Sequence, residues 1–143
     1  MLGSLLKRLL RRSAILPLEQ APKAAGGNWM GEALRLRQQG RHQETIAMCR
    51  SVLARQPDNS DALSFLASAL LAQGESREGI ACLRRVTALA PDSAETFASL
   101  AAVLAATGDP NGAIENYRHA VRRRADFVSA WSDLAALLKA LGR

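Results

Sequence analysis

The sequence predicts an all-α protein: an α-solenoid of about three and a half helical hairpins, preceded by a basic amphipathic N-terminal helix. Apolar and small residues recur every 34 positions, and a period this regular indicates a repeat array. Glycines that can end the first helix of each hairpin keep the same interval: Gly40, Gly74, Gly108 and Gly142. Pro57 and Pro91, also 34 residues apart, fit the ends of second helices.

The chain divides into an arm, a linker and an array. Residues 1–16 form the predicted N-terminal helix, and residues 17–27 form a linker rich in proline, glycine and alanine. Residues 28–143 form the array, with units of about 26–59, 60–93 and 94–127 and a half unit of 128–143.

The N-terminal segment combines leucines with cations. Five leucines between positions 2 and 10 follow helical spacing, and no acidic residue occurs before Glu19. The cations of its opposite arc are the candidate membrane-surface residues Lys7, Arg8, Arg11 and Arg12. A membrane-surface helix, a cap packed on the array and an organellar transit peptide all fit this pattern.

Local signals mark the helices in order along the array. The first pair is predicted at about 28–39 and 43–55. The candidate N-terminal caps of the later helices are Asp58 or Asn59, Ser76, Asp92 in capping-box spacing with Glu95, and Asp109 followed by Pro110. Arg122, Arg123 and Arg124 close the sixth helix as a solvated, dipole-matched end or as a docking point for an acidic partner.

The last predicted helix, 128–141, is apolar nearly all round. A terminal helix of a solenoid normally shows a polar outer face. This helix instead resembles an inner helix whose neighbour is missing. We expect a continuing chain, another subunit or the N-terminal arm to cover it.

The repeated residues resemble those of the tetratricopeptide repeat (TPR) family over Gly26–Gly142. The large apolar position is held by Trp29, Leu63, Phe97 and Trp131, and the small position by Ala33, Ala67, Ala101 and Ala135. The departures from the family pattern are Glu32, Thr45, Gly79 and Ala125.

Charge is distributed unevenly. Residues 1–50 hold nine Lys and Arg against three Asp and Glu, whereas residues 51–143 hold ten of each. The array is therefore nearly neutral, and stacking aromatics interleaved with cations are missing, which argues against nucleic-acid binding.

No apolar run approaches the roughly 20 residues of a membrane-spanning helix. Cys49 and Cys82 lack disulfide or metal spacing, which favours a reducing, cytoplasmic setting with peripheral membrane contact as an option.

No catalytic constellation is visible in the sequence. The two histidines are isolated, His42 is interpreted as a solvated loop residue, and no paired acids, metal cluster or phosphate loop occurs. We therefore expect no enzymatic activity, cofactor or metal in this chain.

The resemblance implies that the binding surface is the concave face formed by the first helices. By register, this face is lined by Met30, Leu34, Arg37, Asp61, Ser64, Phe65, Ser68, Leu71, Ala98, Ser99, Ala102, Ser132 and Asp133, with Glu95, Ala105, Ser129 and Ala136 beside them. The Lys, Asn and Arg set of chaperone-binding TPR domains is missing, as is the Asn ladder of arrays attached to sugar transferases. Gly31, Phe65, Ser99 and Asp133 occupy the ladder positions.

Three functional hypotheses follow. The first is a protein-interaction scaffold that binds a peptide segment or adjoining domain, or that self-associates through the last helix. The second is the N-terminal accessory array of a larger, transferase-type enzyme whose catalytic domain lies downstream. The third is a membrane-tethered assembly factor that uses Lys7, Arg8, Arg11 and Arg12.

Overall fold

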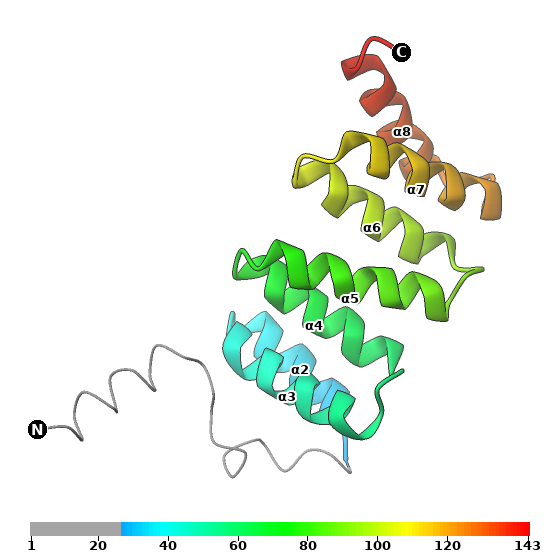
Figure 1. Ribbon diagram of the computed structural model, residues 1–143. Coiled ribbons are helices and arrows are strands. Elements are labelled where there is room, and N and C mark those ends of the chain that lie inside the picture. Colours follow the sequence, from blue (N-terminus) through cyan, green and yellow to red (C-terminus); the bar gives the residue numbers. More distant parts are fainter. Residues whose placement is uncertain (1–26) are drawn as a thin grey trace, which may run out of the picture.

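The computed structural model describes residues 27–143, which fold into seven helices stacked as successive antiparallel hairpins (Figure 1). The helices are α2 (Trp29–Gln38), α3 (His42–Arg55), α4 (Ser60–Ala72), α5 (Ser76–Leu89), α6 (Ala94–Ala106), α7 (Pro110–Arg123) and α8 (Val128–Ala140). The predicted all-α solenoid is therefore confirmed. The predicted N-terminal helix and the four membrane-surface candidates in it lie outside the described residues.

Each first helix ends in the same left-handed turn. Gly74 has φ +79°, and the amide of Glu75 donates to the carbonyl of Leu70 at 2.9 Å. The other predicted turn glycines also have positive φ: Gly40, Gly108 and Gly142. Because a side chain at such an angle is strained, glycine fixes the point at which the chain reverses.

Side-chain caps begin four of the helices. Asn59 accepts from the amide of Ala62 at 2.9 Å, and Asp109, followed by Pro110, accepts from Gly112 at 2.9 Å. Two of the expected caps are wrong. Ser93, not Asp92, caps α6, because its hydroxyl lies within reach of the Thr96 amide. Ser76 is the first residue of α5, and no side chain caps that helix.

Two departures from the family pattern have a structural explanation. Thr45 is fully buried on α3, but its hydroxyl donates to the carbonyl of Arg41 at 3.0 Å, so no polar group is stranded. Gly79 on α5 lies against Leu71 of α4, and a Cβ at this position would come 2.9 Å from the Leu71 Cγ. Glycine therefore allows α4 and α5 to approach closely.

The large apolar position of each hairpin packs differently along the array. Leu63 is 1% exposed in the main core, and the Phe97 ring lies under His119 and Arg123 of α7, the second helix of its own hairpin. Trp131 occupies the equivalent position of α8 but is 50% exposed. No second helix follows it among the described residues, so its ring lacks the cover that Phe97 receives.

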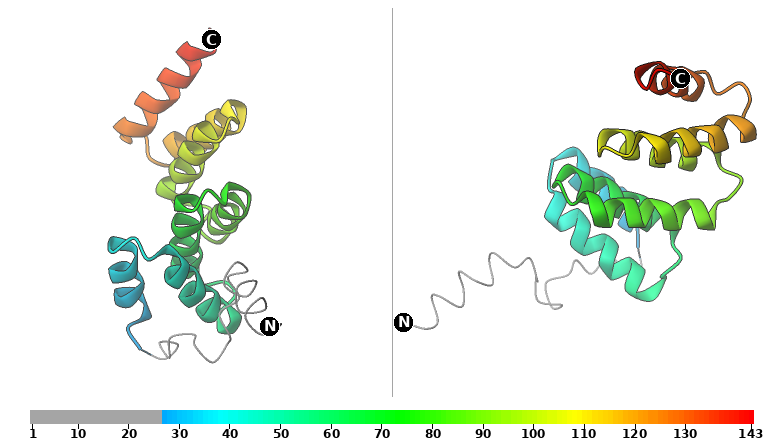
Figure 2. Two further views of the ribbon diagram at one scale, coloured as in Figure 1. Left: turned by 90° about the vertical axis from the view of Figure 1, so that its left-hand side faces the viewer. Right: turned by 45° about the horizontal axis from the view of Figure 1, so that its top comes forward.

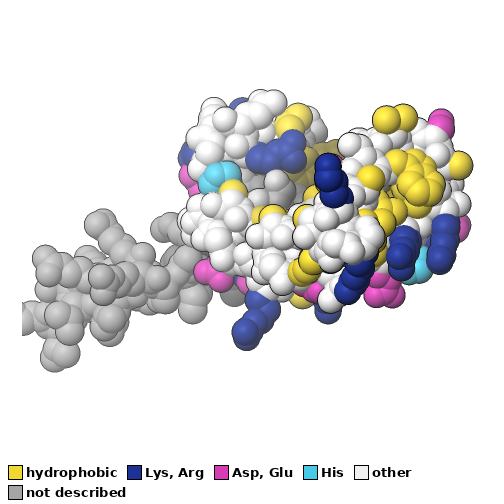
Figure 3. All heavy atoms as spheres, turned by 90° about the horizontal axis from the view of Figure 1, so that it is seen from above, with side chains coloured by type: hydrophobic (Ala, Val, Ile, Leu, Met, Phe, Trp, Pro, Cys, Tyr) yellow, Lys and Arg dark blue, Asp and Glu magenta, His cyan; other side chains and the backbone are white. Residues whose placement is uncertain are grey.

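Large apolar side chains are consequently exposed on α8. Val128 is 77% exposed and Leu141 39% exposed, in addition to Trp131. Figure 3, which looks down on this end of the stack, shows hydrophobic side chains gathered on the surface. We call Val128, Trp131 and Leu141 the open α8 face. It agrees with the expectation that this helix would resemble an inner one.

Candidate functional site

The first helices α2, α4, α6 and α8 form the wall on which sequence reasoning places the binding surface. The stack is curved, with α2 and α8 projecting to the same side (Figure 2, left). Residues of the predicted lining set come together at the two ends of this wall, and each end has its own chemistry.

At the N-terminal end, Phe65 of α4 joins two side chains of α2. Its ring packs edge-on against Trp29, with the centroids 6.1 Å apart and an interplanar angle of 79°. The guanidinium carbon of Arg37 lies 5.0 Å from the Phe65 centroid, a distance suited to a cation–π contact. Arg37 therefore links α2 to the Phe65 side chain of α4.

Two apolar side chains continue that face of α2 into solvent. Met30 is 41% exposed and Leu34 is 38% exposed, and helical spacing places both on the same side as Arg37. Exposed methionine and leucine beside an aromatic ring provide contacts for an apolar segment of a partner.

The middle of the wall contributes less free surface. Asp61, Ser64 and Ser99 are exposed, whereas Ser68 is half-buried. Leu71 and Ala98 pack partly against the cores of their hairpins. These last two predicted lining residues thus support the fold as well as any binding surface.

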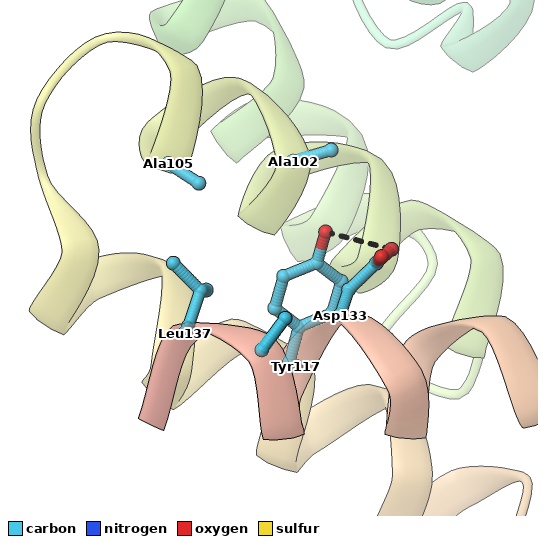
Figure 4. A pocket seen from close by; sticks show the side chains of 6 residues that line it. Ala102, Ala105, Tyr117, Asp133 and Leu137 are labelled. Carbon is cyan, nitrogen blue, oxygen red and sulfur yellow. Dashed lines mark hydrogen bonds between the residues drawn. The ribbon is translucent and has the colours of Figure 1, made fainter. Parts of the chain in front are cut away.

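The C-terminal end of the wall holds a pocket of about 440 Å³ between α6 and α8. It is lined by Ala102, Ala105, Tyr117, Asp133, Ala136 and Leu137. Small side chains of α6 face those of α8, and the Tyr117 ring from α7 closes the floor (Figure 4). The predicted lining residues Ala102 and Asp133 therefore meet in one pocket.

A hydrogen bond holds the polar groups of this pocket. The Tyr117 hydroxyl donates to Oδ2 of Asp133 at 3.2 Å, as the dashed line in Figure 4 marks. Burial, together with the neighbouring Asp133 charge, raises the pKa of Tyr117 to about 12. The hydroxyl therefore remains a hydrogen-bond donor at neutral pH.

Sequence reasoning missed Tyr117 and Leu137 as pocket residues. Tyr117 lies 34 residues after Leu83 and 68 after Cys49, both buried, so the repeat register identifies it as core. Tyr117 is indeed 4% exposed, and its hydroxyl reaches Asp133 of the wall. No sequence signal marks that edge.

The arginine cluster at the end of α7 mostly binds within the chain. Arg123 donates from Nε to the carbonyl of Pro91 and lies 4.3 Å from the Phe97 centroid. Arg124 pairs with Glu95 and lies 3.7 Å from the Phe127 centroid. The expected solvated end therefore holds for Arg122, whereas Arg123 binds the turn that precedes α6 and Arg124 binds side chains of its own hairpin.

The buried cysteines are free thiols. Burial, with a smaller contribution from Cys82, raises the pKa of Cys49 to about 12. Burial also raises the pKa of Cys82. Thiols held protonated in this way are poor nucleophiles.

The interpretation of His42 as a loop residue is wrong. His42 is the first residue of α3 and is half-buried, and its Nδ1 has no hydrogen-bond partner in the structure.

Residues 27–143 contain no group of three or more His, Cys, Asp or Glu side chains placed to hold a metal ion. No helix in the same range is long and apolar enough to cross a membrane.

Comparison with known proteins points to one family. Residues 36–104 match the family model described as tetratricopeptide repeat. No curated protein matches the chain.

Solved structures reproduce the fold. One of them, the MamA protein, is 21% identical with a TM-score of 0.72, over 80% of this chain and 62% of that one. A mutant O-GlcNAc transferase from Thermobaculum terrenum is 28% identical with a TM-score of 0.68, over 83% of this chain and 23% of that one. The first TPR of Spaghetti (RPAP3), bound to an HSP90 peptide, is 16% identical with a TM-score of 0.72, over 80% and 91% of the two chains. The chain thus spans less than two thirds of the first two structures.

Proposed function

The chain belongs to the tetratricopeptide repeat family, and on that premise we propose that it is a protein-interaction scaffold whose concave face binds a peptide segment or an adjoining domain. The observation that carries the proposal is the N-terminal end of the wall, where exposed Met30 and Leu34 continue the face that Arg37 holds against Phe65. The peptide-bound TPR of Spaghetti supports this class of partner through its fold.

The partner segment that fits this end is apolar or amphipathic. Leu34 and Met30 offer aliphatic contact area, and the Phe65 ring is half-buried and held from one side by Trp29. A ring fixed in this way loses little conformational entropy on binding, which favours it as an anchor.

Peptides selected from a displayed random library against the intact chain test the proposal. We expect Leu34→Asp and Phe65→Ala each to weaken a selected peptide by about tenfold or more, as loss of a buried apolar contact predicts. Leu89→Asp is the matched control, because Leu89 is 41% exposed on α5, outside the predicted lining set. Equal affinity of all three variants, with native helical content, would overturn the proposal.

A second candidate function is the accessory array of a larger transferase-type enzyme. Two observations favour it: the open α8 face, and the turn that follows α8. Gly142 has φ +68°, and the amide of Arg143 donates to the carbonyl of Leu138 at 2.8 Å. The same left-handed turn leads into a second helix in the other hairpins. The O-GlcNAc transferase structure, of which this chain covers 23%, is the analogy. The reading frame beyond Arg143 tests it, and a stop codon there counts against it.

A further inference from the structure

The pocket between α6 and α8 has apolar walls and one charged side chain. Ala102, Ala105, Ala136 and Leu137 provide the walls, and Asp133 provides the charge. Asp133 accepts one hydrogen bond from Tyr117, and none of the ion pairs found within residues 27–143 involves it. Glu95 of the same wall, by contrast, is paired with Arg124. The pocket therefore suits an aliphatic side chain with a cation beside it.

One segment of this chain has that chemistry. Residues 1–12 contain five leucines, four cations and no acidic residue. Leu9 and Leu10 directly precede Arg11 and Arg12, so a leucine placed in the pocket brings an arginine close to its rim. We propose that residues 1–12 dock in the pocket of the same chain, with a leucine against Ala102 and Ala105 and an arginine or lysine paired with Asp133.

The length of the intervening chain allows this contact. The twelve residues from Pro17 to Asn28 span up to about 40 Å when extended. At a spacing of about 10 Å between successive layers of the stack, the three hairpin steps from α2 to α8 amount to about 30 Å. Both helices project to the same side of the curved stack (Figure 2), so the two ends of the wall lie on one side of the molecule.

Docking combines two favourable terms. Each leucine that leaves water gains apolar burial, and the Asp133 carboxylate gains a cation that no described residue supplies. The inference does not depend on the proposed function, since it assigns an occupant from the chain itself to one end of the wall. It assigns no occupant to the Met30, Leu34 and Phe65 end.

Limited trypsin digestion of the intact chain, read by mass spectrometry, tests the proposal. Trypsin cuts after Lys7, Arg8, Arg11 and Arg12, and Lys23 in the predicted linker serves as the internal reference. We expect cleavage at the four arm sites to be about tenfold slower than in a synthetic peptide of residues 1–16, as a docked fraction near 90% requires.

Two pocket variants should remove this protection. Ala102→Arg fills the pocket and adds a cation, so trypsin should cleave the arm at the free-peptide rate. Asp133→Asn removes only the charge, so cleavage of the arm should become faster by about fivefold at the most. Ala106→Arg is the matched control, because Ala106 is exposed on the same helix and does not line the pocket. Far-UV circular dichroism and Tm confirm that each variant folds.

Four results would overturn the proposal. They are arm cleavage at the free-peptide rate in the unmodified chain, protection that persists in Ala102→Arg, protection that rises with protein concentration and so reflects a second copy, and protection that needs anionic vesicles. Peptide capture at Phe65 is measured separately, so either proposal can fail without the other.

Discussion

The guanidinium carbon of Arg37 lies 5.0 Å from the centroid of the Phe65 ring, while Trp29 meets the same ring edge-on. Arg37 and Trp29 belong to α2, and Phe65 belongs to α4. These contacts join the first helices of two successive hairpins at the edge of the proposed binding surface.

The Trp29–Phe65 pair should therefore contribute measurably to stability. In a double-mutant cycle of Trp29→Ala and Phe65→Ala, we expect a coupling free energy of about 0.5–1.5 kcal/mol, the usual value for an edge-on aromatic pair. Urea unfolding of the two single variants and the double variant measures it. Additive effects would show that the two rings do not stabilise each other.

A side chain at Gly74 should destabilise the turn. Gly74→Ala forces an L-residue to φ +79°, and we expect the free energy of unfolding to fall by about 1–2 kcal/mol. Gly27→Ala is the control, because a Cβ there meets nothing within 4 Å and its φ is not in the left-handed region. A loss of stability as large in Gly27→Ala would contradict the explanation by backbone angle.

Arg123 should matter more to stability than Arg122. Arg123→Ala removes the hydrogen bond to the Pro91 carbonyl and the contact over Phe97, and we expect a cost of about 1–2 kcal/mol. Arg122 is exposed, so Arg122→Ala should change stability by less than about 0.5 kcal/mol. Thermal unfolding of both variants makes the comparison, and equal shifts would contradict it.

Alkaline pH should destabilise the array. The pKa of Cys49 is raised from 9.0 to about 12, and that of Tyr117 from 10.0 to about 12, so the folded state retains protons that the unfolded chain releases. Stability is therefore complete below about pH 9 and falls as pH rises from 9 towards 12. Urea midpoints at pH 8 and pH 10.5 measure the loss.

The matched variant isolates the thiol. Between the two pH values, the urea midpoint of Cys49→Ala should fall less than that of the unmodified chain, even though the variant is less stable at pH 8.

A thiol reagent at pH 8 should label Cys49 only after denaturation, because the side chain is fully buried. Rapid labelling of the native protein would contradict the burial argument.

The two tryptophans should differ in fluorescence. Trp131 is 50% exposed on the open α8 face, whereas Trp29 is half-buried against Phe65. We expect Trp29→Phe, which leaves Trp131, to emit at longer wavelength and to be quenched by acrylamide several-fold more efficiently than Trp131→Phe. Quenching of Trp131 as weak as that of Trp29 would show that another surface covers α8.

The sequence determined the helical period, the points of reversal and most of the helix starts. These features are local: a left-handed glycine or a capping Asn acts within one turn, so Gly74 and Asn59 can be read without a partner. The large and small apolar positions also follow from the 34-residue spacing, because the same places of each hairpin recur at that interval.

Tertiary structure decided which side chains meet across hairpins. Tyr117 is core by register, but its hydroxyl reaches Asp133 sixteen residues later, and Arg123 reaches back 32 residues to the Pro91 carbonyl. The tilt between successive hairpins sets such contacts, and that tilt depends on the packing of many side chains at once. A periodic pattern records which face of a helix is buried, whereas the pocket between α6 and α8 depends on how far apart two such faces are held.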